Sequence, residues 1–501
     1  MNKSREALEI KLVNDNPQTR YVLQFLFASI GFPFRIVKQW HNPLLKILCA
    51  GSPLERGLPE EEKCDLILPG KTASNRAFAV SYFDGLPLLH GKNTPSPKAF
   101  LDGKRVSLPL IDTCFNLLTR SEEEMSNKQS DGEIRFEVYE SDFYDLGLSQ
   151  IPILNLYICR LRQFITDRLN EKKKEIKSYP LWKNGKKFAI SLTHDIDRIC
   201  YASFKETYNR LRFAFDKKLL PRHRLEALIT SGSQFLKTVK RVGKTEDPYW
   251  NFEKWLTAEK EFGFHSTFFA ITLTEKGAIQ DPAYRLHERV KFQGKIIPVY
   301  QMLYIMHKEG WEIGLHGSVA SFRDPVRMMA EKKELESFCE ISVTGIRQHY
   351  LMFKAQETWN FHEKCGFQYD STLGSNRRIG YRAGVGLPFH PFDAKQNREL
   401  NLVELPLVIQ DGAVMDEEPS SVEHTIERCA RIFQTAKECG ALVVLLWHPN
   451  TAFELAYPGW FTVYKTLLEW LSTQDVFVGT GQEICEWWKE REDQIFLGIE
   501  E

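Results

Sequence analysis

Two aspartates, Asp195 and Asp197, stand at the end of an apolar segment with one residue between them. His194 precedes them, and residues 188–193 alternate large apolar with small or polar side chains, a pattern typical of a β-strand. Because the side chains of an extended strand alternate between its two faces, both carboxylates should project to the same side. Two carboxylates and an imidazole at one strand tip can hold a metal ion and accept a proton. The segment therefore predicts part of a catalytic centre.

Histidines also follow three other predicted strands. The predicted strand at residues 311–315 is followed by His316. The one at 342–346 is followed by Arg347, His349 and Tyr350, and the one at 441–446 by Trp447 and His448. In α/β barrels the active groups lie at the carboxyl ends of the strands. A single histidine after a strand is more often structural, but four such strand ends on one side of a barrel favour an enzyme.

These residue types suit metal-assisted hydrolysis. A divalent metal ion, for which we expect zinc, is held by a carboxylate and imidazoles and keeps an open position for water. A second carboxylate can take the proton of that water, and an imidazole opposite can give a proton to the departing amine. Arg347 can pair with the carboxylate that acts as base and tune its pKa.

The elements that must position these residues alternate between strand and helix. Further strands are predicted at residues 266–271, 402–407 and 476–479, and helices at residues 251–262, 299–308, 422–439 and 482–490. Such alternation implies a parallel sheet. No glycine-rich phosphate-binding turn follows the first strand, which favours a barrel over a nucleotide-binding open sheet. The predicted class is α/β, a distorted (β/α) barrel over residues 179–501.

Residues 1–178 are predicted to form a smaller α/β domain of their own. An apolar helix is expected at residues 20–32, followed by short strands separated by glycine and proline, and an amphipathic helix begins near residue 151. A charged run at residues 170–175 is expected to end that helix and link the two domains.

Composition excludes several classes of protein. Lysine plus arginine and aspartate plus glutamate each number 66, so the net charge is zero and a nucleic-acid partner is not expected. The 10 cysteines lack the spacing of zinc fingers or disulfide frameworks. No stretch approaches the ~18 consecutive apolar residues of a membrane span, and no apolar signal segment stands at the N-terminus. We expect a cytoplasmic protein without an integral membrane segment.

The motifs resemble those of the polysaccharide deacetylase family, the family 4 carbohydrate esterases that share the NodB-homology domain. SLTHDID at residues 191–197 is similar to the first motif of that family, GIRQHY at 345–350 to the third, and LLWHPN at 445–450 to the last. The resemblance covers roughly residues 186–488. It implies that Asp195 is the base, Asp197 a metal ligand, Arg347 the residue that orients the base, and His448 the general acid.

The second motif of the family departs from its usual form in this chain. Family members carry a second histidine four residues after the first, but Ala320 stands at that distance from His316. His349, His194 or a water molecule could supply the missing ligand. We predict that Asp197, His316 and His349 form the metal site.

Two further assignments concern the surroundings of the site. Glu404 or Asp411 is expected to support His448, because both follow the predicted strand at residues 402–407 or lie within it. Tyr350 and Trp447 are predicted to line the substrate site, since aromatic faces pack on the apolar faces of sugars.

The leading hypothesis is a metal-dependent hydrolase of a C–N amide bond that deacetylates an N-acetylated sugar in a glycan or glycan precursor. A second hypothesis keeps the barrel and changes the bond, for example to that of a cyclic ureide. A third, motivated by Ala320, is a non-catalytic glycan-binding or assembly protein on a degenerate deacetylase scaffold. The N-terminal domain resembles an uncharacterised module that precedes deacetylase-like domains.

Overall fold

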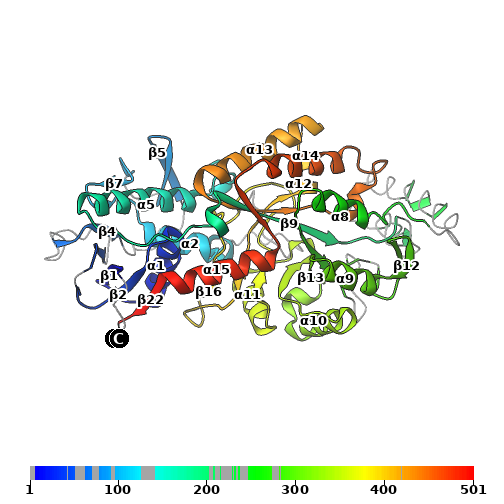
Figure 1. Ribbon diagram of the computed structural model, residues 1–501, viewed down its shortest axis with the longest axis horizontal. Helices are drawn as coiled ribbons and strands as arrows, with labels where there is room; N and C mark the ends of the chain where they lie inside the picture. Colours follow the sequence, from blue (N-terminus) through cyan, green and yellow to red (C-terminus); the bar gives the residue numbers. More distant parts are fainter. Residues whose placement is uncertain are drawn as a thin grey trace.

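Two large sheets, one in each half of the chain, organise the fold in the computed structural model (Figure 1). The structure describes residues 6–41, 43–50, 63–69, 78–91, 96–125, 142–201, 246–272, 281–282, 284–418 and 420–500, together with a few positions between 207 and 236. In Figure 1 the N-terminal elements lie at one end of the molecule, β9 lies near the middle, and α8, α9 and β12 lie toward the other end.

Within the described residues, the larger sheet has nine strands that pair in parallel. Their order is β18-β15-β14-β13-β10-β9-β20-β19, and β21 also pairs with β9. The strands are β9 (Phe188–Ile196), β10 (Thr267–Ala270), β13 (Glu312–Gly317), β14 (Gly345–Gln348), β15 (Tyr369–Asp370), β18 (Val403–Glu404), β19 (Leu407–Gln410), β20 (Leu442–Leu446) and β21 (Val476–Gly479).

The larger sheet is curled. Strands β18 and β19 stand at opposite ends of its order, yet only Leu405 and Pro406 separate them in the chain. Such a short link spans at most about 11 Å, so the two ends of the sheet must lie near each other. The sheet therefore curls like an open barrel, in agreement with the predicted α/β class.

Strand β9 shows how the sequence divides the two faces of this sheet. All nine of its residues are buried. Large apolar side chains and His194 share one face, where His194 contacts Trp255 and Tyr464 from two helices. Thr193 and Asp195 project to the other face, inside the curl. Alternation along one strand thus separates a packing face from a site-bearing face.

Helices connect the parallel strands, as the sequence pattern predicts. They are α8 (Phe252–Lys260), α9 (Val299–Lys308), α10 (Pro325–Cys339), α11 (Ala355–Lys364), α12 (Asp411–Met415), α13 (Val422–Cys439), α14 (Trp460–Ser472) and α15 (Gly481–Ile495). Two antiparallel hairpins are inserted between them, β11 (Arg289–Phe292) with β12 (Lys295–Pro298) and β16 (Phe392–Asp393) with β17 (Arg398–Glu399).

The N-terminal sheet has seven strands in the described part of the chain, in the order β22-β2-β1-β3-β4-β8-β7. They are β1 (Leu8–Leu12), β2 (Phe34–Val37), β3 (Lys46–Ala50), β4 (Leu66–Pro69), β7 (Leu101–Asp102), β8 (Arg105–Val106) and β22 (Phe496–Ile499). The other elements here are the hairpin β5 (Phe78–Phe83) with β6 (Leu86–Gly91) and the helices α1 (Pro17–Ile30), α2 (Leu110–Leu118), α3 (Ser121–Met125), α4 (Asp142–Asp145) and α5 (Ile153–Glu171).

The two halves are joined through the C-terminal segment. Strand β22 pairs in parallel with β2, so the last strand of the chain belongs to the N-terminal sheet. In α15, the buried Arg491 donates to the carbonyls of Ala28, Ser29 and Pro180. The two halves also share one hydrophobic core. The predicted domain boundary near residue 178 remains a prediction. Strand β22 follows that boundary in the chain but belongs to the N-terminal sheet.

Several elements follow their predicted bounds to the residue, among them α9, α13 and β21. The prediction of a single strand at residues 402–407 was wrong, because the segment forms two strands, β18 and β19, with Pro406 between them. Proline lacks the N–H that a sheet ladder needs, so the strand breaks there. Among the described residues, no helix combines the length and the apolar character needed to cross a membrane.

Candidate metal centre and active site

Polar side chains from five strand ends converge at one edge of the larger sheet. Strands β9, β13, β14, β19 and β20 run in parallel, so their carboxyl ends meet at that edge. These ends carry the predicted residues Asp195, Asp197, His316, Arg347, His349 and His448, together with Asp411. The structure thus brings together residues that are more than 250 positions apart in the chain.

Asp195 is buried and held by Arg347. The Nη1 atom of Arg347 donates to Asp195 Oδ1 at 2.9 Å and to Thr193 Oγ1 at 2.8 Å. Its Nε and Nη2 atoms donate to the carbonyl and hydroxyl oxygens of Ser371, both at 2.9 Å. Ser371 and Thr193 thus fix the guanidinium of Arg347, and the guanidinium in turn binds one carboxylate oxygen of Asp195, Oδ1. The other, Oδ2, lies 3.9 Å from Nε2 of His316.

Asp197, His316 and His349 form a group of side chains that could hold a metal ion. Their ligand atoms lie within 4.8 Å of one another, and this is the one such group of acidic or histidine side chains among the described residues. Asp197 Oδ1 is 3.2 Å from His316 Nε2, and Asp197 Oδ2 is 3.6 Å from His349 Nε2. Two imidazoles and one carboxylate are the ligand set of many catalytic zinc sites.

The fit of a metal ion is supported by an orphaned oxygen. Asp197 Oδ1 is buried and accepts no hydrogen bond of good geometry from the described residues, although His316 Nε2 lies 3.2 Å away. A buried carboxylate oxygen without a donor is costly. Asp197 Oδ1 and His316 Nε2 therefore face each other as two ligands of the same metal ion do.

Hydrogen bonds to the other ring nitrogens orient both histidines. His316 Nδ1 donates to the carbonyl of Arg347 at 2.9 Å, which directs Nε2 into the site. His349 Nδ1 lies 3.4 Å from Asp281 Oδ1, and the same oxygen accepts the backbone N–H of Val319 at 2.6 Å. Partners of this kind fix the tautomer and direction of metal-binding imidazoles.

The charges of the site are strongly coupled. Burial alone would raise the pKa of Asp197, but the neighbouring His349, His316 and His448 outweigh it and hold the pKa well below its usual range. Burial alone would lower the pKa of His349, and the carboxylate of Asp197 instead raises it to about 9. The site therefore keeps the carboxylate of Asp197 ionised in a partly buried position, as a metal ligand requires.

His448 faces the same cluster from β20 and is supported by Asp411. Its Nδ1 lies 2.9 Å from Asp411 Oδ1, and its backbone N–H donates to Asp411 Oδ2 at 2.8 Å. Its Nε2 lies 3.5 Å from Asp197 Oδ2. Burial lowers the pKa of His448, but Asp411 outweighs it and raises the pKa to about 10. Of the two predicted supports, Asp411 is the one in contact, whereas Glu404 binds Trp359 Nε1 at 2.8 Å.

His194 does not take the place of the missing histidine, contrary to one of the predicted alternatives. It is fully buried, with Nδ1 2.6 Å from the carbonyl of Trp447 and Nε2 2.7 Å from Glu259 Oε1. Its ring stacks on Phe268. Because it alternates with Asp195 along β9, it points to the packing face of the sheet. Of the two alternatives, His349 is the one that the fold places beside Asp197.

The two predicted aromatic residues differ in position. Tyr350 is 46% exposed and its ring lies 4.4 Å from that of His349, so it stands at the rim of the site. Its φ of 57° is left-handed, a strained conformation for a tyrosine. Trp447 is fully buried and packs against Tyr464, so the prediction that its ring lines an accessible substrate site was wrong. The position of Trp447 after a strand does not reveal from the sequence that its side chain faces the core.

Two residues of the site were not identified from the sequence. Ser371 binds Arg347 and also donates to the carbonyl of Leu405, which ties β14 to the next strands. Asp281 supports His349 from a segment that is distant in the chain. Neither residue stands in a motif, so only proximity in space reveals it.

Comparison with known proteins gives a family-model match for one part of the chain and distant structural likenesses for another. A family of unknown function (DUF7033) matches residues 8–170, and no curated protein matches the chain. A Mycobacterium smegmatis protein described as a polysaccharide deacetylase is 18% identical over 62% of this chain and 93% of its own, with a TM-score of 0.40. The Puue allantoinase is 14% identical over 63% of this chain and 94% of its own, with a TM-score of 0.40.

A protein from Pseudomonas aeruginosa PAO1, also described as a polysaccharide deacetylase, is 14% identical over 63% of this chain and 95% of its own, with a TM-score of 0.39. Such likenesses concern the arrangement of elements and assign no activity. The family match lies within the predicted N-terminal domain and covers less than half of the chain.

Proposed function

We propose that this protein hydrolyses a C–N amide bond and that its substrate is an N-acetylated sugar in a glycan or glycan precursor. One observation carries the proposal. A donor set for a metal ion, a carboxylate paired with a buried arginine, and a histidine paired with a buried aspartate converge at one edge of a curled parallel sheet. Each of the three groups has a distinct part in amide hydrolysis.

Asp197, His316 and His349 would hold the divalent metal ion, for which the two imidazoles and one carboxylate favour zinc. Bound there, such an ion polarises the amide carbonyl and lowers the pKa of a water molecule. The missing histidine at position 320 is then replaced by His349.

The protons are moved by residues of this chain. Asp195 has one oxygen bound by Arg347 and the other directed toward His316, so Oδ2 is placed to take a proton from the attacking water. His448 carries a proton on Nε2 because Asp411 stabilises the charged ring. It gives this proton to the amine nitrogen as the C–N bond breaks, and the products are acetate and a free amino sugar.

The fold and location complete the proposal. We assign the curled sheet to a distorted (β/α) barrel of the polysaccharide deacetylase type, with a separate N-terminal domain over residues 1–178 and the barrel domain over residues 179–501. Tyr350, at the rim, would contact the sugar. A cytoplasmic location would make a soluble or lipid-linked precursor the substrate rather than a finished cell wall.

The test is release of acetate by the purified full chain loaded with zinc. Oligomers of N-acetylglucosamine serve as the substrate, and allantoin represents the cyclic ureides. We expect acetate release that Asp195→Asn and His448→Ala each reduce by roughly 100-fold or more. His424→Ala, at an exposed position of α13, is the matched control and should keep the wild-type rate. Unchanged rates in both site variants would contradict the proposal. Hydrolysis of allantoin without release of acetate from the sugar would show that the substrate is a cyclic ureide and not an N-acetylated sugar.

A further inference from the structure

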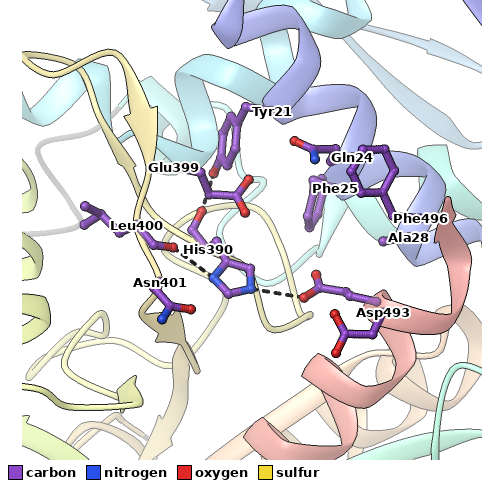
Figure 2. Close-up of a pocket in the computed structure, with 11 residues that line it drawn as sticks. Tyr21, Gln24, Phe25, Ala28, His390, Glu399, Leu400, Asn401, Asp493 and Phe496 are labelled. Atoms are coloured by element: carbon purple, nitrogen blue, oxygen red, sulfur yellow. Dashed lines mark hydrogen bonds and ion pairs between the residues drawn. The ribbon is translucent and has the colours of Figure 1, made fainter. Parts of the chain in front are cut away.

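A second cavity, of about 380 Å³, lies between α1, the β16–β17 hairpin and α15 (Figure 2). Sites for small molecules have volumes of roughly 300–1,000 Å³, so the space is large enough for a ligand. Its lining shares no residue with the candidate metal centre. The side chains that matter here are Tyr21, Phe25, His390, Glu399, Glu492 and Asp493.

The cavity carries an excess of negative charge. His390 donates through Nδ1 to the carbonyl of Leu400 at 3.0 Å, and its Nε2 lies 3.0 Å from Glu492 Oε2. Because both ring nitrogens face oxygen acceptors, the ring holds both protons and is positively charged. This charge compensates Glu492 directly and Glu399 more weakly, so one cation faces the three carboxylates of Glu399, Glu492 and Asp493.

Nearby basic side chains do not supply the missing charge. Arg398 binds Glu363, with Nη1 3.0 Å from Oε1, and Lys489 Nζ donates to Gln368 Oε1 at 2.7 Å. Within the described part of the chain, neither Glu399 nor Asp493 forms an ion pair with a lysine or an arginine, and His390 is held by Glu492. A bound cation would therefore supply the charge that the cavity lacks.

Glu399 is the more telling of the two carboxylates. The surrounding protein encloses it except where the cavity leaves its surface open, and burial raises its pKa to about 7. Figure 2 shows its carboxylate directed into the space beside Gln24 and Phe25. Partial removal of a carboxylate from water costs free energy, which a cation bound against it would offset.

One side of the cavity has an apolar and aromatic lining. Phe25 and Phe496 form one wall with Ala28, and Tyr21 stands nearby, its hydroxyl donating to the carbonyl of His390 at 2.7 Å. Aromatic faces attract ammonium groups and pack against hydrocarbon. We propose that this cavity binds a small organic cation, with its ammonium group against Glu399 and Asp493 and a compact apolar body against the phenylalanine rings.

The arrangement favours an organic cation over a metal ion. A metal ion needs ligand atoms that converge within a few ångströms. Among the described residues, three acidic or histidine donors come within 4.8 Å of one another at Asp197, His316 and His349 and not in this cavity. The carboxylates here are spread around a larger space, which suits a ligand with a body.

Calorimetric titration of the full chain at pH 8 tests the proposal. The probes are cyclohexylammonium chloride, the uncharged cyclohexanol of similar shape, and magnesium chloride. We expect one cyclohexylammonium per chain and at least about tenfold weaker binding of cyclohexanol. Glu399→Gln and Asp493→Asn should each weaken the amine by about fivefold or more. Glu490→Gln, at an exposed position of α15 outside the lining, is the matched control and should change nothing.

The proposal fails if the amine does not bind at millimolar concentration, if cyclohexanol binds equally well, or if neither variant weakens the amine. It also fails if magnesium binds with one-to-one stoichiometry and displaces the amine. Asp493 is exposed, so Asp493→Asn keeps the test decisive even if Glu399→Gln fails to fold. His316→Ala should leave amine binding unchanged, which separates this site from the proposed hydrolysis.

Discussion

Asp411 holds His448 through two contacts, one to the side chain at 2.9 Å and one to the backbone N–H at 2.8 Å. The carboxylate thus fixes both the ring and the loop that carries it. Because Nδ1 is directed to Asp411, Nε2 is the nitrogen that faces the metal-binding cluster. The pair has the geometry of an oriented general acid.

Replacing Asp411 should therefore slow the chemical step. In Asp411→Asn the ring of His448 loses the charge that stabilises its protonated form, and we expect kcat for acetate release to fall by about 10- to 100-fold with little change in KM. Steady-state kinetics measure both constants. Asp416→Asn, an exposed position a few residues further on, is the control. A wild-type kcat in Asp411→Asn would show that the pair has no part in proton transfer.

The pairing of Arg347 with Asp195 should appear as a coupling in stability. Arg347→Met leaves Asp195 buried without its cation, and we expect the free energy of unfolding to fall by about 3–5 kcal/mol. Asp195→Asn in the same background should restore part of that loss, because the uncompensated charge is gone. Urea denaturation of the single and double variants measures the coupling. Strictly additive effects would argue against a charge pair.

His194 should be a structural residue and not a metal ligand. His194→Ala removes one partner of the buried Glu259 and the imidazole bound to the Trp447 carbonyl, so we expect a loss of about 2–4 kcal/mol in the free energy of unfolding. Zinc content measured by mass spectrometry should remain one ion per chain in the folded variant. A protein that folds normally but loses its zinc would identify His194 as a ligand.

Stability should fall with rising pH because of the second cavity. Burial lowers the pKa of His390, but Glu492 outweighs it and raises the pKa from its ordinary 6.5 to about 9, so the stabilising charge is present below 6.5 and is lost as the pH rises through 9. Burial raises the pKa of Glu399 from 4.5 to about 7, so its ionisation above 4.5 also destabilises the fold. His390 and Glu399 therefore both contribute less to the free energy of unfolding as the pH rises.

The measurement is urea denaturation of wild type and His390→Gln at several pH values from 5 to 10. The stability difference between them should shrink by on the order of 2 kcal/mol as the pH rises. His424→Gln, at an exposed position, should follow the wild-type pH dependence. A constant difference between wild type and His390→Gln would mean that His390 carries no stabilising charge.

Much of the larger sheet could be predicted from local patterns. The alternation at residues 188–193 identified β9, and the helical spacing identified α9 and α13 to the residue. Strand β15 was missed because two residues are too few to show an alternation, and β22 was missed because its partner β2 lies at the other end of the chain. Pairing between distant segments leaves no periodic signal in either one.

The site could be predicted as a set of residue types at strand ends, but not as a set of contacts. The motifs brought forward Asp195, Asp197 and Arg347, whose side chains do meet the same edge. They left His194 and His349 open as alternatives, and alternation along β9 decides between them because His194 faces the core. The support from Asp281 depends on a fold that places distant loops together, and no spacing within the chain reveals it.

A zinc titration of the full chain, followed by calorimetry, tests most directly whether His349 completes the metal centre with Asp197 and His316. Wild type should bind one zinc ion per chain, and His349→Ala should bind it at least about 100-fold more weakly. His424→Ala should bind zinc as wild type does. Binding of zinc by His349→Ala with wild-type affinity would contradict the proposed site, and with it the replacement for the histidine absent at Ala320.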